Sequence, residues 1–489
     1  MNFNLDNILE EFKQKRGIFI HDYSTNKKIS YQDFYKKILD LKNEVYKLNS
    51  KSTYILDTAN DIQSLIYITT FLLCKKKILL KDKKNFDKKT FSNFNLSFCH
   101  FKNFKKIIPL SKKGVKRKII ESDFDLLIMS SGSTGKSKLV KLKFKKSILN
   151  SHSMNLQLNL DSNNIHLLIM PIYHVNSLFF SFFSSILNKQ KLIIASNFYI
   201  FDFWKIIKKF KVKSTSISPT IVKYLNLLKI KEIPKSLNKV VCSSSFLSKE
   251  DYFNFRKIYK IYIIHGYGLS EATNFNCLMP MNKNYRRKVV NNFKKEKYVT
   301  IGSPIKFNDM NILNNNKISN RQNVRGEIVI KGEFLFEGYI GKKKFNQMYL
   351  KTGDIGYYKI FNNKKFFFIT SRIKEIIKFK DETIYPSDVE NYLLNNINKN
   401  LDLFCFRLYE NDLETIGCVI DKDSVNSKIL EKIKLYYKKK CYNYFPRNFF
   451  ITDIKKFKTT TLKPRRNELT NFLLQNSNKY FKEKIINRI

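Results

Sequence analysis

Short apolar runs alternate with amphipathic segments along most of this 489-residue chain, and this alternation restricts its fold more than any other feature. In residues 31–48, apolar side chains recur every three to four positions, as one face of a helix requires. Uniformly apolar or β-branched runs are typical of strands buried on both faces of a parallel sheet. The sequence therefore predicts an α/β fold, with further helices at 203–210 and 219–229 and strands at Thr53–Leu56, Leu167–Met170, Lys191–Ala195, Lys239–Cys242 and Ile261–Ile264.

The character of the sequence changes twice in the C-terminal half. From about residue 295 to 370, glycine-punctuated or aromatic runs such as Arg325–Gly332 and Lys365–Thr370 predict a smaller β-rich subdomain. Beyond about residue 373, helical and strand patterns are mixed, and a basic, threonine-rich loop follows at 458–466. Because no long Pro/Gly/Ser linker separates these parts, a boundary near 371–375 has to be short and hinge-like.

The chain is strongly basic, with 91 Lys and Arg against 41 Asp and Glu and a formal net charge of +50. Such an excess is typical of proteins that bind nucleic acids or anionic membranes. Here most of the cations are lysines, spread over the full length among many Asn, Ile, Phe and Tyr, while glycine is scarce at 14 residues. This composition indicates the codon bias of an A+T-rich genome. A nucleic-acid partner is therefore not expected, and peripheral contact with a membrane is left open.

Cysteine usage indicates a reducing compartment. The seven cysteines are scattered and form neither a C-x-x-C motif nor a metal-ligand spacing. The N-terminus lacks the basic stretch and apolar core of a signal peptide. The longest apolar run, from Ser64 to Cys74, is shorter than the roughly 20 residues that a membrane span needs. We therefore expect a cytoplasmic protein without a transmembrane segment.

A loop suited to phosphate follows the apolar run Leu126–Met129. It is rich in hydroxyl groups and contains Gly132, Gly135, Lys136 and Lys138. Glycine lets backbone N–H groups approach a ligand, while hydroxyl and ammonium groups add donors and positive charge. The spacing differs from that of a Walker A loop. A solvated turn is the alternative when the loop is considered alone.

Two motifs with polar side chains follow. Pro171–Leu178 contains His174 among apolar residues, where a core or surface imidazole would look the same. The second motif directly follows the predicted strand Ile261–Ile264, where the side chains suit a stacked base, a phosphate contact and a Mg²⁺ ligand. An ordinary turn is the alternative for this second group, which consists of Tyr267, Ser270 and Glu271.

Three more segments carry isolated charged groups. Asp354 lies in the glycine turn Thr352–Gly356 and provides an acceptor of the kind that ribose hydroxyls require, unless it only forms an Asx-turn. Arg372 offers a planar fork of donors that suits phosphate or ribose oxygens, although a charged surface helix would also contain it. Lys463, in the basic loop, could reach a developing charge or simply be solvated.

In their order and spacing, these segments resemble the adenylate-forming superfamily of acyl-CoA synthetases, luciferases and carrier-protein adenylation domains, and are closest to the acyl-CoA synthetases. The resemblance extends from about residue 30 to about residue 470. It implies a large N-terminal domain, residues 1–372, of stacked α/β sheets with a β-rich subdomain. Residues 373–489 would form a small, mobile α+β lid domain.

The resemblance also implies a role for each motif residue. The β- and γ-phosphates of ATP would be held by Ser131, Gly132, Ser133, Thr134, Gly135 and Lys138. The adenine, the α-phosphate and the ribose would be contacted by Ser244, Tyr267, Gly268, Ser270, Asp354 and Arg372. Catalysis would depend on Glu271 as the Mg²⁺ ligand, His174 as the gate of the carboxylate pocket, and Lys463, which would neutralise transition-state charge. The hinge and the acceptor tunnel would involve Lys374, Lys378 and Asp381.

The implied reaction is the ATP-dependent ligation of a carboxylic acid to a thiol. The carboxylate would attack the α-phosphorus of MgATP to give an acyl-adenylate and pyrophosphate, and CoA would then displace AMP. A fatty or other small organic acid is expected, because the segments that would wall the pocket contain Phe179, Phe180, Phe246 and Phe275. The alternatives are an enzyme that loads a carrier-protein thiol, a nucleotide-binding pseudoenzyme and a nucleic-acid-binding protein.

The chain departs from the family pattern mainly by losing glycines. Ser371 precedes Arg372, and Leu462 precedes Lys463, where relatives have glycine. Asp381 replaces a tunnel glycine, so that its carboxylate could obstruct the thiol acceptor. The motif residues that serve the first half-reaction are present, which predicts that adenylation is retained and leaves the thioester step in question.

Overall fold

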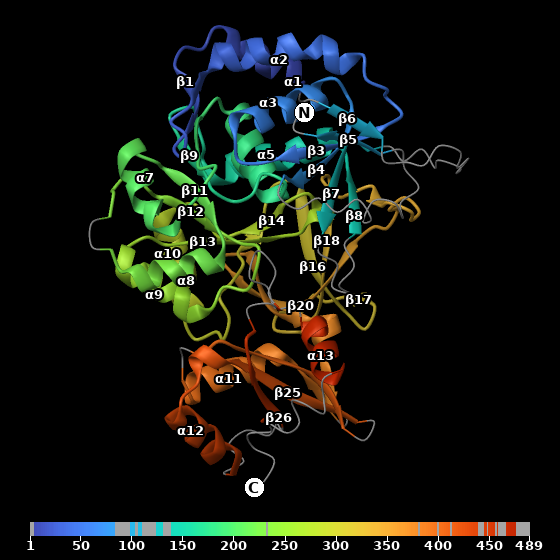
Figure 1. The fold of residues 1–489 in the computed structure, drawn as a ribbon. Helices are drawn as coiled ribbons and strands as arrows, with labels where there is room; N and C mark the ends of the chain where they lie inside the picture. The colour runs from blue at the N-terminus through green and yellow to red at the C-terminus, as the bar shows by residue number, and fades with distance from the viewer. Residues whose placement is uncertain are drawn as a thin grey trace.

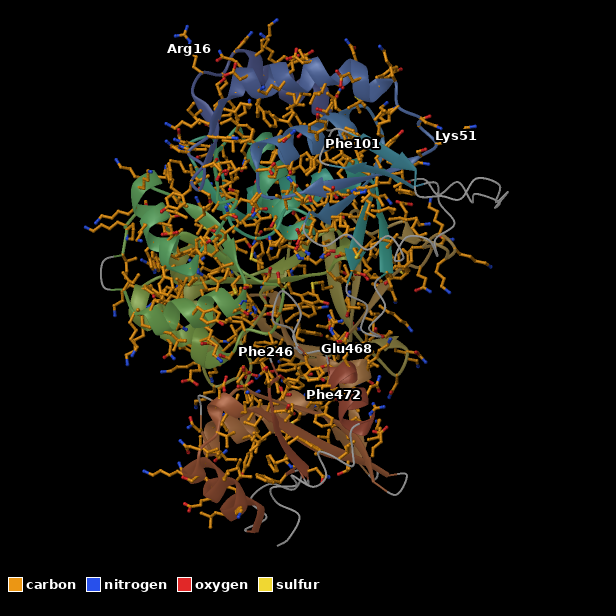
Figure 2. All side chains as sticks on the ribbon, in the orientation of Figure 1. Arg16, Lys51, Phe101, Phe246, Glu468 and Phe472 are labelled. Atoms are coloured by element: carbon orange, nitrogen blue, oxygen red, sulfur yellow. The ribbon has the colours of Figure 1, made fainter. Side chains whose placement is uncertain are left out.

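The computed structural model describes residues 4–83, 98–102, 106–109, 124–130, 138–230, 233–379, 382–398, 401–410, 413–438, 445–446, 448–454, 457 and 466–475. They form a large N-terminal part and a smaller C-terminal part, which lies below it in Figure 1. Figure 2 shows Phe246 of the large part and Glu468 and Phe472 of the small part close to the junction between them. The predicted α/β class is confirmed, whereas the boundary at residue 372 stays a prediction.

The first sheet of the large part has nine strands within the described residues, in the order β15-β14-β13-β12-β11-β9-β10-β1-β2. In the same order, the strands span Ser303–Pro304, Phe275–Leu278, Ile264–Gly268, Lys239–Cys242, Ser214–Ile217, Ile165–Leu168, Lys191–Ile194, Ile18–Asp22 and Lys28–Ser30. All neighbours from β13 to β1 are parallel. Parallel strands need crossover connections, and between β10 and β13 these are the helices α7 (Phe203–Phe210), α8 (Pro219–Leu228) and α9 (Lys249–Tyr259).

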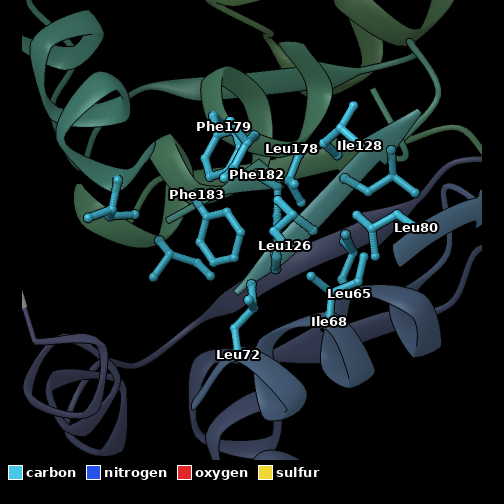
Figure 3. Close-up of a cluster of buried hydrophobic side chains, with 14 of the residues drawn as sticks. Leu65, Ile68, Leu72, Leu80, Leu126, Ile128, Leu178, Phe179, Phe182 and Phe183 are labelled. Atoms are coloured by element: carbon cyan, nitrogen blue, oxygen red, sulfur yellow. The ribbon is translucent and has the colours of Figure 1, made fainter. Parts of the chain in front are cut away.

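The second sheet packs against the first through helices. Its described strands follow the order β19-β8-β7-β4-β3-β5-β6 and span Gly338–Tyr339, Lys138–Leu142, Leu126–Ser130, Lys77–Asp82, Thr53–Thr58, Phe98–Lys102 and Lys106–Pro109. Helix α3 (Ile62–Leu73) and a π-helix, η2 (Asn176–Phe183), both pack side chains against Leu126 and Ile128 of β7 (Figure 3). The core between them contains Leu65, Ile68, Leu126, Ile128, Leu178, Phe179 and Phe182, all at most 1% exposed.

The β-rich subdomain predicted from the glycine-punctuated sequence is present as a third sheet. This antiparallel sheet has the order β17-β16-β18-β20-β21, with strands at Lys317–Ile318, Asn308–Asn314, Gly326–Gly332, Leu350–Phe361 and Lys364–Arg372. The remaining helices of the large part are α1 (Leu5–Glu10), α2 (Tyr31–Tyr46), α5 (Phe144–Leu158), α6 (Ser184–Leu187) and α10 (Lys283–Asn292), together with short 3₁₀ turns.

The C-terminal part has hydrophobic cores of its own. Two clusters of buried side chains contain only residues from Ile377 onward. Strands β22 (Ile377–Phe379) and β23 (Glu382–Ile384) form a hairpin, and β24 (Leu403–Glu410), β25 (Leu413–Asp421) and β26 (Asn448–Thr452) form a small sheet. The helices are α11 (Pro386–Asn396), α12 (Ser427–Lys438) and α13 (Arg466–Gln475).

One predicted strand is wrong in a way that matters for the site. The apolar run Ile261–Ile263 only leads into β13, which begins at Ile264 and continues through Gly268. The reason is pairing, since Ile264 and His265 lie opposite Val241 and Cys242 of β12, while Gly266 and Tyr267 pair with β14. The motif residues Gly266 to Gly268 therefore belong to the strand itself and do not follow it.

Candidate active site

Asp354 is a buried carboxylate between the buried Tyr267 and the more exposed Arg372. It is opposite Arg372 in the β20–β21 ladder, and Arg372 Nε lies 2.8 Å from Asp354 Oδ1. Tyr267 of β13 donates its hydroxyl to Asp354 Oδ2 at 2.6 Å. Asp354 is 3% exposed, so these two donors supply hydrogen bonds that a buried carboxylate requires. The structure thus brings together Tyr267 and Asp354, which lie 87 positions apart in the sequence, with Arg372 of the neighbouring strand β21.

The charge of Asp354 favours the protonated forms of its two partners, Arg372 and Tyr267. The carboxylate of Asp354 raises the pKa of Arg372 above its ordinary value. Burial raises the pKa of the Tyr267 hydroxyl, and the charge of Asp354 adds to this effect. Both groups therefore stay protonated at neutral pH. Each carboxylate oxygen has about two lone pairs, so Asp354 can accept further hydrogen bonds from two adjacent hydroxyls, such as those of a ribose.

The turn before Asp354 has a backbone that suits glycine. Gly353 has a φ of +73°, in the left-handed region, and donates its N–H to Glu327 Oε1 at 2.8 Å. Thr352 accepts the N–H of Asp354 at 3.1 Å and donates its hydroxyl to the carbonyl of Ile328 at 2.7 Å. These bonds tie the motif to β18 and fix the direction in which Asp354 leaves the strand.

The end of β13 also needs a glycine, for a steric reason. A Cβ atom at Gly268 would lie 1.7 Å from the carbonyl oxygen of Asn274. The chain then forms a 3₁₀ turn, η4 (Ser270–Ala272), in which Ser270 and Glu271 are partly exposed. The close approach at Gly268 therefore places the hydroxyl and the carboxylate of the motif directly beyond the buried Tyr267.

Glu271 is held from both its main chain and its side chain. Its carbonyl accepts the N–H of Phe336 at 2.9 Å, and its Oε1 accepts the hydroxyl of Tyr339 at 2.8 Å. Lys138 Nζ lies over the ring of the same tyrosine, 4.7 Å from its centroid. The predicted phosphate-binding lysine and the predicted metal ligand therefore meet at one side chain, which the sequence had not singled out.

No group of three or more His, Cys, Asp or Glu side chains that could hold a metal ion occurs in the part of the chain that the structure describes. Glu271 is thus a single candidate carboxylate. This donor set fits Mg²⁺, which proteins often bind through one or two carboxylates while nucleotide phosphates and water supply the other ligands. It does not fit a structural zinc site, which needs four protein ligands.

The predicted phosphate loop is bracketed by two paired strands. Strand β7 ends at Ser130, opposite Lys138 at the start of β8, and the two strands run antiparallel. Five residues between these strands were predicted to hold phosphate and lie outside the described residues, namely Ser131, Gly132, Ser133, Thr134 and Gly135. Asp381 and Lys463 also lie outside the described residues. The roles of all these residues stay predictions.

The segments that contain His174 and Ser244 are linked by a hydrogen bond. Asn176 begins the π-helix η2 two residues after His174 and donates its side-chain amide to Ser243 Oγ at 3.2 Å. Ser244 has a φ of +80°, a conformation that favours glycine, although it is a serine. His174 is partly buried and packs against Tyr173, with 4.7 Å between the ring centroids.

The predicted pocket wall is mostly hydrophobic core. Phe179, Phe180 and Phe275 are each at most 1% exposed and pack in the two main core clusters. Phe246 is 53% exposed, and its ring lies 6.2 Å from that of Tyr298. Packing of the hydrophobic core therefore accounts for three of the four phenylalanines, and none of the four identifies a substrate.

The predicted hinge lies beside a cleft of about 480 Å³ between the β-rich subdomain and the hairpin β22–β23. Lys374 is exposed in a 3₁₀ turn, Ile373–Glu375, directly after β21. Lys378 donates from Nζ to Thr383 Oγ1 at 2.6 Å and lines the cleft with Arg325 and Lys351. Neither lysine contacts the Asp354 cluster through a hydrogen bond of the described residues, so their roles stay predictions.

The sequence reasoning missed Tyr339. A signal was present, because Gly338 precedes it in a chain that contains only 14 glycines. Gly338 has a φ of +113°, and a Cβ there would lie 2.9 Å from the carbonyl oxygen of Lys343. In a glycine-poor chain, a glycine that remains indicates a geometric requirement, and here the requirement lies next to a site residue.

Among the described residues, no helix is both long enough and apolar enough to cross a membrane.

The sequence matches the family profile described as AMP-binding enzyme over residues 51–340. The chain is 27% identical over 297 residues to a 2-succinylbenzoate–CoA ligase of Bacillus pumilus, covering 57% of this chain and 56% of that protein. It is 26% identical over 292 residues to 4-coumarate–CoA ligase-like 9 of Arabidopsis thaliana, covering 56% of this chain and 49% of that protein. The matched region thus spans about half the length of these relatives.

The fold is similar to that of a solved structure over almost the whole chain. An O-succinylbenzoate coenzyme A synthetase from Bacillus subtilis, in complex with AMP, superposes with a TM-score of 0.77 at 18% identity. The superposition covers 95% of this chain and 98% of that one. At this identity the likeness establishes the shared fold.

Proposed function

Because the chain belongs to the AMP-binding enzyme family, we propose that it is an AMP-forming ligase that joins a carboxylic acid to a thiol. The acid would be activated as an acyl-adenylate with release of pyrophosphate, and the acyl group would then pass to CoA. The observation that carries this proposal is the cluster of buried Asp354 and Tyr267 with the exposed Arg372, which provides acceptors for a ribose within range of the charge of Glu271.

The residues of the site fit the binding of a nucleotide. Asp354 would accept the ribose hydroxyls, Tyr267 would present its ring to the adenine, and Arg372 would keep Asp354 charged. Ser270 and the loop that ends at Lys138 would contact the phosphates. Bound through Glu271 and the phosphates, Mg²⁺ would offset the negative charge that otherwise repels an attacking carboxylate.

The remaining predicted residues complete the proposal. His174 would line the entrance of the carboxylate, because Asn176 connects its segment to the Ser243–Ser244 turn. Lys463 would stabilise the charge that develops between the carboxylate and the α-phosphorus. Lys374 would serve as the hinge, with Lys378 and Asp381 near the path of the acceptor.

The replaced glycines do not contradict retained activity. Ser371 lies within β21, paired with Ile355 of β20, in an extended backbone that any residue adopts. Ser244 keeps a left-handed backbone at a cost of roughly 1 kcal/mol. Neither serine therefore occupies a backbone conformation that its side chain excludes.

The acid is proposed to be a fatty or other small organic acid. Relatives are named for 2-succinylbenzoate and 4-coumarate, both of which present an aromatic ring and a carboxylate. At the identities observed these names do not identify the acid for this chain, and a panel of acids has to include both compounds.

The test is acid-dependent exchange of labelled pyrophosphate into ATP, with fatty acids, 4-coumarate, 2-succinylbenzoate and amino acids. We expect exchange with one class of acid and a loss of two or more orders of magnitude in Lys463→Ala. Folded, ATP-binding protein that exchanges with no acid would contradict the proposal. Active acids are then tested with CoA and with carrier proteins, and Asp381→Gly should speed the thioester step more than adenylation if Asp381 obstructs the acceptor.

A further inference from the structure

Tyr339 occupies a junction between two parts of the site that are distant in sequence. Its strand β19 pairs antiparallel with β8, which begins at Lys138, and Tyr339 lies opposite Val140. The neighbouring Ile340 donates its N–H to the carbonyl of Leu139 at 3.0 Å. On the other side, Phe336 N–H binds the carbonyl of Glu271. The segment 336–340 therefore ties the end of the phosphate loop to the turn that contains Glu271.

The hydroxyl and the aromatic ring of Tyr339 contact different residues. The hydroxyl donates to Glu271 Oε1 at 2.8 Å, while the ring face receives the ammonium of Lys138 at 4.7 Å. A cation over a tyrosine ring is attracted by its quadrupole.

A hydrogen bond to one oxygen restricts the rotation of the Glu271 carboxylate and leaves the second oxygen for another partner. Partners of this kind orient metal-binding carboxylates, and their removal typically costs about 10- to 100-fold in metal affinity or activity. No other hydrogen bond to the Glu271 side chain is recorded in the described residues.

We propose that Tyr339 is a positioning residue that orients Glu271 for Mg²⁺ through its hydroxyl and holds Lys138 beside the nucleotide phosphates through its ring. The inference rests on the proposed nucleotide site and adds to it a residue outside the predicted motifs. It requires that hydroxyl and ring make separable contributions.

Two substitutions separate these contributions. Tyr339→Phe keeps the ring and removes only the hydroxyl, so the Mg²⁺ concentration for half-maximal pyrophosphate exchange should rise about 10-fold, with little change in the affinity for metal-free ATP. Tyr339→Leu also removes the ring, and it should weaken the binding of metal-free ATP in addition. Tyr31→Phe is the matched control, because the Tyr31 hydroxyl donates to the backbone carbonyl of Lys189, away from the site.

The binding measurements are titrations of ATP by calorimetry with and without Mg²⁺, and they need no knowledge of the acid. An unchanged Mg²⁺ dependence in Tyr339→Phe, or an equal change in Tyr31→Phe, would overturn the inference while leaving the proposed function intact. Wild-type protein that does not bind ATP at all would overturn the proposed function, and this inference with it. A melting temperature equal to that of Tyr31→Phe shows that the variant is folded.

Discussion

Ser244 is a serine at a position whose backbone conformation favours glycine. Its φ of +80° is one that serine adopts only at a cost of about 1 kcal/mol. Gly268 differs, because a Cβ there would lie 1.7 Å from a backbone oxygen. Glycine therefore occupies the site position where a side chain cannot fit, and a serine occupies one where the left-handed conformation costs little. This distinction explains why the glycine-poor motifs were still recognisable in the sequence.

Asp354 offers a direct test of ribose recognition at the scale of one residue. In Asp354→Asn the uncharged amide can accept at only one atom, so AMP affinity should fall about 10- to 100-fold, the equivalent of losing one or two hydrogen bonds to a charged group. The measurement compares AMP with 2′,3′-dideoxy-AMP by calorimetry. Wild type should prefer AMP, and the variant should lose most of this preference.

Asp309→Asn is the matched control, since Asp309 accepts a hydrogen bond from Asn311 in β16 and lies outside the Asp354 cluster. A variant at Asp354 that discriminates between the two nucleotides as strongly as wild type would show that the ribose is recognised elsewhere.

Some helices and strands of the large part could be predicted from the pattern of apolar residues alone. Helix α7 and strand β12 have the predicted bounds, and the apolar residues that predicted them are buried: Phe203, Trp204, Ile206 and Ile207 in α7, and Val240, Val241 and Cys242 in β12. The strand at Ile261–Ile264 was wrong because pairing with β12 and β14, which sequence periodicity does not reveal, decides where β13 begins. For the same reason, the contacts of Tyr339 could not be predicted, since they depend on β19 joining the edge of a sheet built from distant segments.

The scarcity of glycine is also evident at the C-terminal ends of helices. Helices α7, α8 and α9 all end at a lysine in the left-handed conformation, namely Lys211, Lys229 and Lys260. Glycine is the favoured residue there, because it has no Cβ to strain. The scarcity of glycine is thus a property of the whole chain, which supports the interpretation of the altered site motifs as compositional change.

Replacing such a lysine by glycine should stabilise the protein. Lys260→Gly should raise the free energy of unfolding by about 1 kcal/mol, since it relieves the left-handed strain at the end of α9. Lys257→Gly in the same helix should lower it by about 1 kcal/mol, because glycine is unfavourable within a helix. Both lysines are exposed, so the loss of charge is matched. Urea unfolding is followed by the fluorescence of Trp204, whose ring lies 4.6 Å from that of Tyr259. Equal effects of the two substitutions would contradict the strain at Lys260.

At the scale of the whole molecule, one carboxylate of the C-terminal part is bound by several groups of the N-terminal part. Asp388, in the first turn of α11, lies 2.8 Å from Lys297 Nζ and 3.3 Å from Arg325 Nη1, and it accepts the hydroxyl of Tyr298. Its side chain is 17% exposed. Burial alone would raise the pKa of Asp388, but hydrogen bonds from Lys297 and Tyr298 outweigh this effect and lower it. The cluster therefore favours the observed orientation of the two parts above the ordinary pKa of the carboxyl group, and this contribution is lost as the pH falls below it.

Removing this charge should loosen the C-terminal part without unfolding it. Asp388→Asn keeps the size of the side chain and weakens two partly exposed ion pairs and one hydrogen bond. The observed orientation should therefore lose about 1 kcal/mol, so that the ratio of detached to docked C-terminal part rises about fivefold. Because the turn Ile373–Glu375 connects the two parts, trypsin should then cleave after Arg372 or Lys374 about fivefold faster, as measured by mass spectrometry of the fragments. Glu431→Ala is the control, since Glu431 is exposed on α12 and belongs to neither the cluster nor the hinge. If cleavage in Asp388→Asn matches that in Glu431→Ala, other contacts between the two parts set their orientation, and the predicted hinge does not depend on this cluster.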